Sequence, residues 1–275
     1  MQIIDGKKIR DQILQTVKEE VAKLSFVPLF CDVLVGEDLA SVQYVAMKAR
    51  VAEEVGIKFY QANFEATITT EELVREIQAL NNMPNMCGII AQLPLPEHID
   101  KRAVLDAIDS RLDVDCLGSK TSSEFYMGNS KIGFPTALAC MAVLDSISLN
   151  LSGKNVLVMG QGDLVGKPVT ALLKARGVVA HTITRNTVSK EELMKNADVI
   201  ISGMGQGKYI TGDMIKQGAV IVDAGTSEEN SAIVGDVDFE SVSKVASHIS
   251  PVPGGVGPVT VAMLLKNVLT VAKNR

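Results

Sequence analysis

The chain has 275 residues, of which 47% are hydrophobic and 21% are charged, and its formal net charge is −5. These values are typical of a globular α/β protein with one or two domains. Aromatic residues make up only 4%, tryptophan is absent, and the sequence contains no basic cluster. We therefore expect no nucleic-acid partner, since nucleic acids are bound through basic patches and base stacking.

The amino-terminal residues contain no apolar targeting segment, and the longest apolar runs are shorter than a membrane span. We expect a cytoplasmic protein with no membrane partner. The 4 cysteines are scattered and no pair has metal-ligand spacing, so free buried thiols are expected rather than disulfides. The 3 histidines share no local spacing either, and no metal site is predicted.

Strand and helix patterns alternate along the first half of the chain. In some segments apolar residues recur at the spacing of a helix. Other segments are continuous apolar runs, which are typical of buried strands. Thr69 and the acids that follow it form a helix-start signal. This alternation predicts a parallel sheet with right-handed crossovers. Strands are expected at 28–35, 58–64 and 87–91, and helices at 9–24, 41–55, from 69 onward and at 100–108.

Residues 116–135 are rich in serine and glycine, and we interpret them as a polar connector where the domain changes. The alternation then resumes, and glycine-rich strand ends at 202–207 and 223–226 leave the carboxyl edge of the sheet open, where such sheets bind ligands. Strands are expected at 156–159, 179–184, 199–202, 220–223 and 248–249, and helices at 135–148, 168–175, 190–196, 211–216, 239–245 and 259–272.

A glycine-punctuated turn lies between the strand at 156–159 and the helix that follows it. Gly160, Gly162 and Gly166 give the spacing Gly-x-Gly-x-x-x-Gly, one residue longer than the dinucleotide fingerprint. Glycines permit a tight turn, and the next helix offers free N–H groups to a phosphate. The turn therefore indicates either a nucleotide site or an ordinary strand-to-helix connection.

Three stretches of the first half could carry chemistry. Tyr44 and Lys48 lie one helical turn apart, so the phenol can orient the ammonium for acid–base work; a surface lysine beside a tyrosine is the alternative. Gln92 follows a buried strand and precedes two prolines, which suits either a polarising amide or a simple turn. Asp113 and Asp115 place two carboxylates on one side of an extended segment. They could bind an amino-pyrimidinone edge or be solvated loop acids.

The segment from Pro251 to Pro258 contains three prolines and three glycines in eight residues. Such a backbone is rigid and can approach a ligand closely. A helical pattern starts immediately afterwards, so this segment has no slack to act as a linker.

Together these stretches resemble the methylenetetrahydrofolate dehydrogenase/methenyltetrahydrofolate cyclohydrolase family. The resemblance follows the chain in order and covers essentially all of it. The matching segments are Ser41-x-x-Tyr44-Val45-x-x-Lys48, Gly88-Ile89-x-x-Gln92-Leu93-Pro94-Leu95-Pro96, Asp113-Val114-Asp115, Gly160-x-Gly162-x-x-Val165-Gly166-Lys167-Pro168, Val234-Gly235-Asp236-Val237-Asp238-Phe239 and Pro251 through Pro258.

The resemblance implies a role for each matching residue. Lys48 would act at the reacting carbon with Gln92, Tyr44 would pack on the aminobenzoyl ring, and Asp115 would hold the amide and amino edge of the pterin. These four are the expected catalytic residues. Tyr44 and Asp115 would also bind substrate, together with Pro253, Gly254 and Gly255. The expected cofactor-binding residues are Gly160, Gln161, Gly162, Val165, Gly166, Arg185, Thr136, Gly203, Gly225, Gly257 and Thr260.

The implied fold is α/β, with a folate-binding catalytic domain at 1–134, completed by the C-terminal helix 259–275, and a Rossmann-like NAD(P)-binding domain at 135–258. The implied activity is oxidation of 5,10-methylenetetrahydrofolate to the methenyl form, followed by hydrolysis to 10-formyltetrahydrofolate. A homodimer that serves one-carbon metabolism and purine biosynthesis would also be expected.

Several positions depart from the family pattern. Leu112 and Cys116 flank the Asp113–Asp115 motif where the family has lysine and glycine, and the family's Pro-Cys-Thr-Pro reads Phe134-Pro135-Thr136-Ala137. Gln161 replaces the arginine of the cofactor turn.

The cofactor choice depends on Arg185. The strand that ends before it contains no terminal acid, and an arginine suits a 2′-phosphate whereas an acid suits a free ribose hydroxyl. We therefore expect NADP rather than NAD, the alternative being an exposed arginine without a ligand. Two other functions stay open: a dehydrogenase with weak or no cyclohydrolase activity, possibly NAD-dependent, and a non-catalytic folate- or nucleotide-binding protein.

Overall fold

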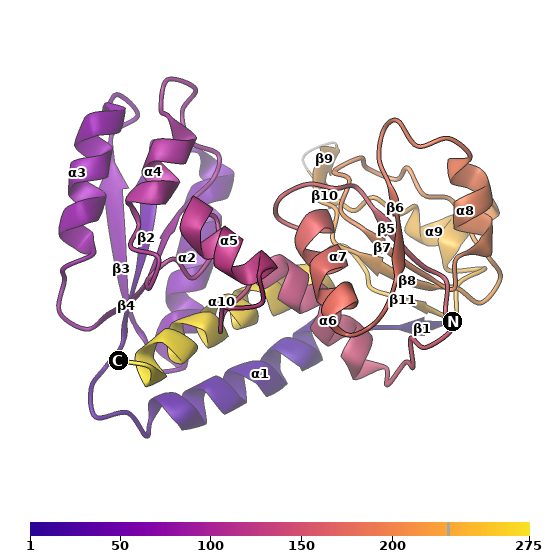
Figure 1. Ribbon diagram of the computed structural model, residues 1–275, viewed down its shortest axis with the longest axis horizontal. Helices are drawn as coiled ribbons and strands as arrows, with labels where there is room; N and C mark the ends of the chain where they lie inside the picture. The colour runs from indigo at the N-terminus through magenta and orange to yellow at the C-terminus, as the bar shows by residue number, and fades with distance from the viewer. Residues whose placement is uncertain (230–231) are drawn as a thin grey trace. The chain divides into compact units, whose positions relative to one another are not determined.

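The computed structural model describes residues 1–229 and 232–275, and the chain divides into two compact units (Figure 1). Unit 1 comprises Met1–Asp11 and Pro135–Met263, and unit 2 comprises Gln12–Phe134 and Leu264–Arg275. Two helices contribute residues to both units, namely α1 (Gly6–Val21) and α10 (Val256–Lys273).

Unit 2 contains a three-stranded parallel sheet in the order β3-β2-β4, as the alternating pattern predicted. All seven residues of the central strand β2 are buried. Helix α2 packs on β2 and β3, and α3 lies beside α4 (Figure 1). The elements are β2 (Leu29–Val35), α2 (Leu39–Glu54), β3 (Lys58–Phe64), α3 (Thr70–Leu80), β4 (Met86–Ala91), α4 (Lys101–Ala107) and α5 (Ser119–Tyr126).

Local signals set the helix starts in this unit. The Thr69 hydroxyl accepts a hydrogen bond from the Glu72 N–H (3.2 Å) and the Glu72 carboxylate accepts one from the Thr69 N–H (2.9 Å), which completes the predicted capping box of α3. Asp38 caps α2 by a single bond, in which its carboxylate accepts the N–H of Ser41 at 2.8 Å. These caps use backbone donors that the first helical turn leaves unpaired.

Helix α5 corrects one expectation, because it lies inside the segment predicted to be a polar connector. Its last residues pack on a neighbouring aromatic ring, with 5.0 Å between the ring centroids of Phe125 and Phe134. Thr121 is buried as well. The polar composition of this helix concealed it in the sequence, since its stability comes from tertiary packing.

The segment from Leu112 to Asp115 runs parallel to β4. The N–H of Ile89 donates to the carbonyl of Leu112 (2.8 Å), and Ile89 pairs with Asp113 in an isolated bridge. The amide of Asn267, on α10, donates to the Val114 carbonyl at 2.8 Å. Two elements thus hold this segment next to the strand that leads to Gln92.

Unit 1 is built on a six-stranded parallel sheet in the order β1-β11-β8-β7-β5-β6, which confirms the Rossmann-like prediction. Strand β1 was not expected; it pairs with β11 and brings residues 1–11 into this unit. The strands are β1 (Gln2–Ile3), β5 (Val156–Met159), β6 (Ala180–Ile183), β7 (Val199–Ser202), β8 (Val220–Asp223) and β11 (His248–Ile249).

The helices of unit 1 also follow the predicted order, with one exception. The helix expected at 211–216 is only the short 3-10 turn η1 (Gly212–Met214). An antiparallel pair, β9 (Ser227–Glu229) with β10 (Ala232–Val234), had not been expected. The remaining helices are α6 (Pro135–Ser146), α7 (Gly166–Ala175), α8 (Lys190–Asn196) and α9 (Phe239–Val242).

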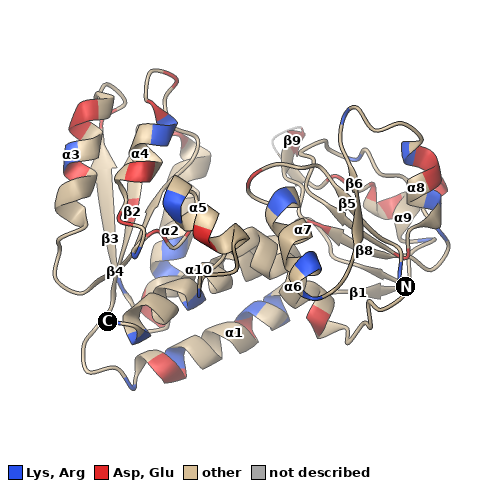
Figure 2. Cartoon of the chain, viewed as in Figure 1, with Lys and Arg blue, Asp and Glu red and all other residues tan. Residues whose placement is uncertain are grey.

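All four cysteines are buried and free, as predicted. Helix α10 has 18 residues with a mean hydropathy of 1.3, so its length and composition would allow it to cross a membrane. A helix of this kind was not predicted from the sequence, in which only shorter apolar runs were expected. However, 61% of it is buried inside the protein, which is typical of a core helix. Figure 2 shows acidic and basic residues interspersed on the helices, for example on α8, as the small net charge of −5 suggests.

Candidate active site

Three predicted residues of unit 2 meet around one amine. Lys48 projects from α2 and is only 1% exposed. Its Nζ donates to Oε1 of Gln92 at 2.8 Å and lies 4.8 Å from the centroid of the Tyr44 ring. Gln92 directly follows β4, and its Nε2 donates to the carbonyl of Leu93 at 2.6 Å, which turns the amide oxygen toward the lysine. Tyr44 is 36% exposed, so its ring is accessible to a ligand.

A fourth residue of this group was not identified from the sequence. Oδ2 of Asp32 lies 2.5 Å from Nζ of Lys48, and Asp32 is fully buried in the middle of β2. Burial raises the pKa of the Asp32 carboxyl, and the neighbouring lysine opposes this rise. The only sequence signal was a single acid within an apolar strand.

The two acids of the Asp113–Asp115 motif have different surroundings. Asp113 is buried and accepts a hydrogen bond from the Gly118 N–H at 2.8 Å, so it fixes the turn that follows. Asp115 is only partly buried. Desolvation and the charge of Asp113 raise its pKa to about 7, while Lys48 opposes the rise. Asp115 is therefore the acid whose ionisation changes near neutral pH.

In unit 1, the glycine turn connects β5 to α7. Gly160 has a φ of +84°, and a Cβ there would lie 2.5 Å from the Gly203 carbonyl oxygen. A Cβ on Gly166 would lie 1.9 Å from the Gly160 oxygen. By contrast, a Cβ on Gly162 would meet no atom within 4 Å. The backbone therefore requires glycine at positions 160 and 166, and position 162 faces open space.

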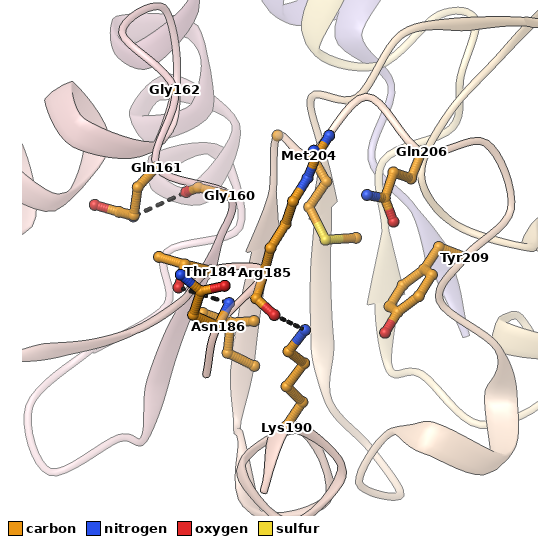
Figure 3. A pocket seen from close by; sticks show the side chains of 12 residues that line it. Gly160, Gln161, Gly162, Thr184, Arg185, Asn186, Lys190, Met204, Gln206 and Tyr209 are labelled. Atoms are coloured by element: carbon orange, nitrogen blue, oxygen red, sulfur yellow. Dashed lines mark hydrogen bonds between the residues drawn. The ribbon is translucent and has the colours of Figure 1, made fainter. Parts of the chain in front are cut away.

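A cavity of about 420 Å³ opens beside this turn (Figure 3). Five residues that the resemblance assigns to the cofactor line it, namely Gly160, Gln161, Gly162, Arg185 and Gly203. Lys190, at the start of α8, lines it too and was missed by the sequence-based prediction. Its Nζ donates to the Arg185 carbonyl at 2.8 Å (Figure 3).

The cavity is therefore lined by two cations. The described residues that line it include no aspartate or glutamate. Arg185 extends its side chain into the space between the turn and Met204 (Figure 3). Gln161 replaces the family's arginine. Its side-chain Nε2 donates a hydrogen bond to the Gly160 carbonyl at 2.8 Å, so this side chain bonds to the turn itself.

The other predicted cofactor residues of unit 1 do not line this cavity. Thr136 lies at the start of α6, Val165 and Gly166 lead into α7, Gly225 follows β8, and Gly257 and Thr260 belong to the first turns of α10. The predicted folate contacts Pro253, Gly254 and Gly255 form the loop before α10, where Gly254 has a φ of +107° and its carbonyl accepts the N–H of Gly6 at 3.1 Å.

Two buried acids, to which the sequence analysis assigned no role, shape the carboxyl edge of the sheet in unit 1. Asp236 accepts hydrogen bonds from the Ser202 hydroxyl (2.6 Å) and from the N–H groups of Met204 and Gln206 (both 2.7 Å). Asp223 accepts hydrogen bonds from the N–H groups of Gly225 (2.9 Å), Asp236 (3.1 Å) and Val237 (3.0 Å). These bonds fix the loops that border the cavity. Within the ranges 1–229 and 232–275, no group of three His, Cys, Asp or Glu residues is arranged to hold a metal.

Comparison with known families decides the assignment of the two units. Residues 4–115 match the catalytic domain of tetrahydrofolate dehydrogenase/cyclohydrolase, and residues 135–275 match the NAD(P)-binding domain of the same family. The chain belongs to the tetrahydrofolate dehydrogenase/cyclohydrolase family. This confirms the family predicted from the motifs and the two-domain α/β fold.

Relatives of this family align over essentially the whole chain. The bifunctional protein FolD of a Nitratiruptor species is 42% identical over 279 residues, covering 100% of this chain and 99% of its own. FolD of Moorella thermoacetica is 42% identical over 280 residues, with 99% of each chain covered. The crystal structure of the FolD enzyme from Campylobacter jejuni superposes with a TM-score of 0.96 at 37% identity, covering 100% of this chain and 99% of the other.

The crystal structure of the methylenetetrahydrofolate dehydrogenase-cyclohydrolase (FolD) of Trypanosoma brucei, complexed with NADP and an inhibitor, matches with a TM-score of 0.93 at 35% identity. The match covers 99% of this chain and 97% of the other. The catalytic-domain match contains Asp32, Lys48, Gln92 and Asp115, and the NAD(P)-binding match contains the glycine turn and its cavity.

Proposed function

We propose that this chain oxidises 5,10-methylenetetrahydrofolate to 5,10-methenyltetrahydrofolate with NADP and then hydrolyses the product to 10-formyltetrahydrofolate. The observation that carries the proposal is the buried amine of Lys48, fixed by Gln92 and covered by Tyr44, within the catalytic domain of the family. The names of its relatives, bifunctional FolD proteins, support both activities.

The folate would be bound mainly by unit 2. The exposed ring of Tyr44 offers a flat surface to the aminobenzoyl group. Ionised Asp115 can accept two parallel hydrogen bonds from the amide and amino groups of the pterin. The rigid loop of Pro253, Gly254 and Gly255 in unit 1 would add backbone contacts to the substrate. We also assign the folate role to residues 1–134 with helix 259–275, and the cofactor role to 135–258.

The residues of the cavity in unit 1 fit a dinucleotide phosphate. Two cations, Arg185 and Lys190, line it, and Gly162 leaves room for close approach of a ligand to the backbone. When bound, NADP accepts the hydride from the methylene carbon, whose neighbouring nitrogens share the resulting positive charge. The chain's contribution to this step is to hold and orient the reactants.

The hydrolysis would use Lys48 directly. The methenyl carbon is an electrophile, and water adds to it while a neutral Lys48 removes one proton of that water. Gln92 holds the amine in place through its oxygen, at 2.8 Å. The amine is almost fully buried, so it is shielded from bulk solvent during the reaction.

NADP is the preferred cofactor of this proposal, with NAD as the alternative. Arg185 and Lys190 can both contact a 2′-phosphate, and the lining residues provide no acid for a free ribose hydroxyl. The complex of the Trypanosoma brucei relative with NADP supports the same choice. Replacing Arg185 by alanine should raise the KM for NADP about tenfold, whereas that for NAD should change little, because one charge-assisted contact contributes about 1.5 kcal/mol. Equal effects on both cofactors would contradict the assignment.

A weaker cyclohydrolase is a second candidate, favoured by one observation. Cys116 stands where the family pattern has glycine, and its φ is +60°, in a region that glycine adopts at lower cost. A strained residue next to Asp115 could alter the pterin site. Accumulation of the methenyl product during turnover would distinguish this candidate from the fully bifunctional enzyme.

The decisive experiment mixes purified full-length protein with methylenetetrahydrofolate and either NADP or NAD, and follows the absorbance of the reduced cofactor and the methenyl product. Lys48→Ala should reduce hydrolysis to a slow residual rate. If the protein binds folate or nucleotide but shows no turnover with NADP or with NAD, it would instead be a non-catalytic folate- or nucleotide-binding protein. We further propose that the enzyme is a cytoplasmic homodimer that supplies one-carbon units for purine biosynthesis.

A further inference from the structure

A carboxylate lies in a fully buried strand of unit 2. Asp32 occupies the middle of β2, the central strand of the sheet, where all seven residues are buried. The alternation of side chains puts it on the same face as Phe30 and Leu34. An unpaired charge is very costly at such a position, and an apolar residue would satisfy the packing better. The presence of an acid therefore calls for an explanation.

Asp32 depends on a single partner. Its Oδ2 lies 2.5 Å from Nζ of Lys48, and no other described residue donates a hydrogen bond to either carboxylate oxygen. The lysine has two further neighbours, Oε1 of Gln92 at 2.8 Å and the ring of Tyr44 at 4.8 Å. The surroundings of the amine are thus an acid, an amide oxygen and an aromatic face, and only the acid can take a proton from it near neutral pH.

We infer that Asp32 is a positioning residue for Lys48 in the hydrolytic step, where it fixes the amine beside Gln92 and exchanges one proton with it. The inference rests on the proposed function, in which Lys48 takes a proton from water. In one state the pair is ammonium and carboxylate, and in the other it is amine and carboxylic acid. The pair has no net charge in either state, so the reactive amine can form in a buried site without a proton crossing to solvent.

The proton balance of the step is as follows. The water oxygen forms a bond to the methenyl carbon, and one water proton moves to the Lys48 amine while Asp32 holds the proton it had received earlier. The bond between that carbon and folate N5 then breaks, and N5 takes a proton from the Lys48 ammonium. The remaining hydroxyl proton leaves to solvent, which gives the formyl group on N10 and one released proton for each water consumed.

Other titratable groups surround the pair. Tyr44 comes from α2, Cys31 from β2, and Asp115 from the segment beside β4; the charge of Asp32 acts on all three, and Asp113 acts on Asp115. Burial raises the pKa of the Asp32 carboxyl, which makes its acid form accessible, although Lys48 opposes the rise. A buried pair with a purely structural role is the competing explanation, since such pairs can often be replaced by apolar side chains.

The test compares wild-type enzyme with Asp32→Asn, an uncharged side chain of the same size, in the hydrolysis of methenyltetrahydrofolate between pH 6 and 9. Glu54→Gln makes the same acid-to-amide change at the exposed end of α2 and serves as the matched control. We expect kcat of Asp32→Asn to fall on the order of ten- to hundredfold. The acidic limb of its pH profile should move to higher pH by about one unit or more, because without the carboxyl the reactive amine can form only by losing its proton to solvent.

Two further readouts separate positioning from a structural role. The KM for NADP should stay unchanged, and the double variant Asp32→Asn/Lys48→Ala should be no slower than Lys48→Ala alone, since residues that act as a unit are not additive. A lower kcat with an unshifted pH profile, or an additive double variant, would overturn the inference.

Folding of each variant is checked by circular dichroism, and Asp32→Ser replaces Asp32→Asn if the latter does not fold. If neither folds, the carboxylate is required for folding, and its assignment to catalysis is wrong. A wild-type protein that does not hydrolyse the methenyl compound would refute the proposed function itself, together with this inference. Active wild-type enzyme with an unaffected Asp32→Asn variant would refute only the inference.

Discussion

Replacing Gly166 by alanine should break the cofactor turn. The new Cβ would lie 1.9 Å from the Gly160 carbonyl oxygen, whereas real Cβ contacts essentially never fall below 3.0 Å. The backbone must therefore move by about 1 Å, and overpacking of this kind costs about 3 kcal/mol when both atoms belong to rigid backbone. The melting temperature should fall by roughly 6–12 °C, and the KM for NADP should rise because the first turn of α7 shifts.

Gly162→Ala provides the matched control within the same turn. Its Cβ would meet no protein atom within 4 Å, so the melting temperature should stay within about 1 °C of the wild-type value. Position 162 lines the cavity, and the added methyl group should raise the KM for NADP by crowding the ligand. Differential scanning fluorimetry and initial rates measure both quantities. A Gly166→Ala variant with wild-type melting temperature and KM would refute the steric reasoning.

Two further predictions concern unit 2. The pKa of Asp115 is about 7, so about one molecule in eleven carries the ionised acid at pH 6. The KM for folate should therefore be about tenfold higher at pH 6 than at pH 8. Asp115→Asn should raise this KM and remove its pH dependence. The side-chain amide of Asn267 donates to the carbonyls of Val114 (2.8 Å) and Gly133 (2.7 Å). Asn267→Ala would leave both buried carbonyls without this donor and should lower the free energy of unfolding by about 2–5 kcal/mol. Urea titration should show this loss but little change for exposed Asn82→Ala, and equal losses would contradict the burial argument.

Much of the site could be predicted because short-range patterns encode it. Tyr44 and Lys48 are one helical turn apart, so any helix over this segment brings them together. The glycine turn follows a strand and precedes a helix, and its steric role follows from local backbone geometry. These relations depend on a few neighbouring residues and not on how the sheet is assembled.

Other features depended on contacts between distant segments. Asp32 looked like an isolated acid in a strand, and its pairing with Lys48 required α2 to pack on β2. Lys190 could be assigned to the cavity only once α8 had been placed beside the turn. Helix α5 was hidden because its polar residues give no apolar stripe, and Phe125 anchors it to Phe134.

The sequence by itself determined the family, through the resemblance of its motifs, and it determined the alternation of strands and helices, because repeating apolar patterns and glycine turns are local properties. Only the tertiary structure decided which charges are buried together. The energy of a buried charge depends on its three-dimensional neighbours, so the partnership of Asp32 with Lys48 and the ionisation of Asp115 near neutral pH could not be read from their positions in the chain.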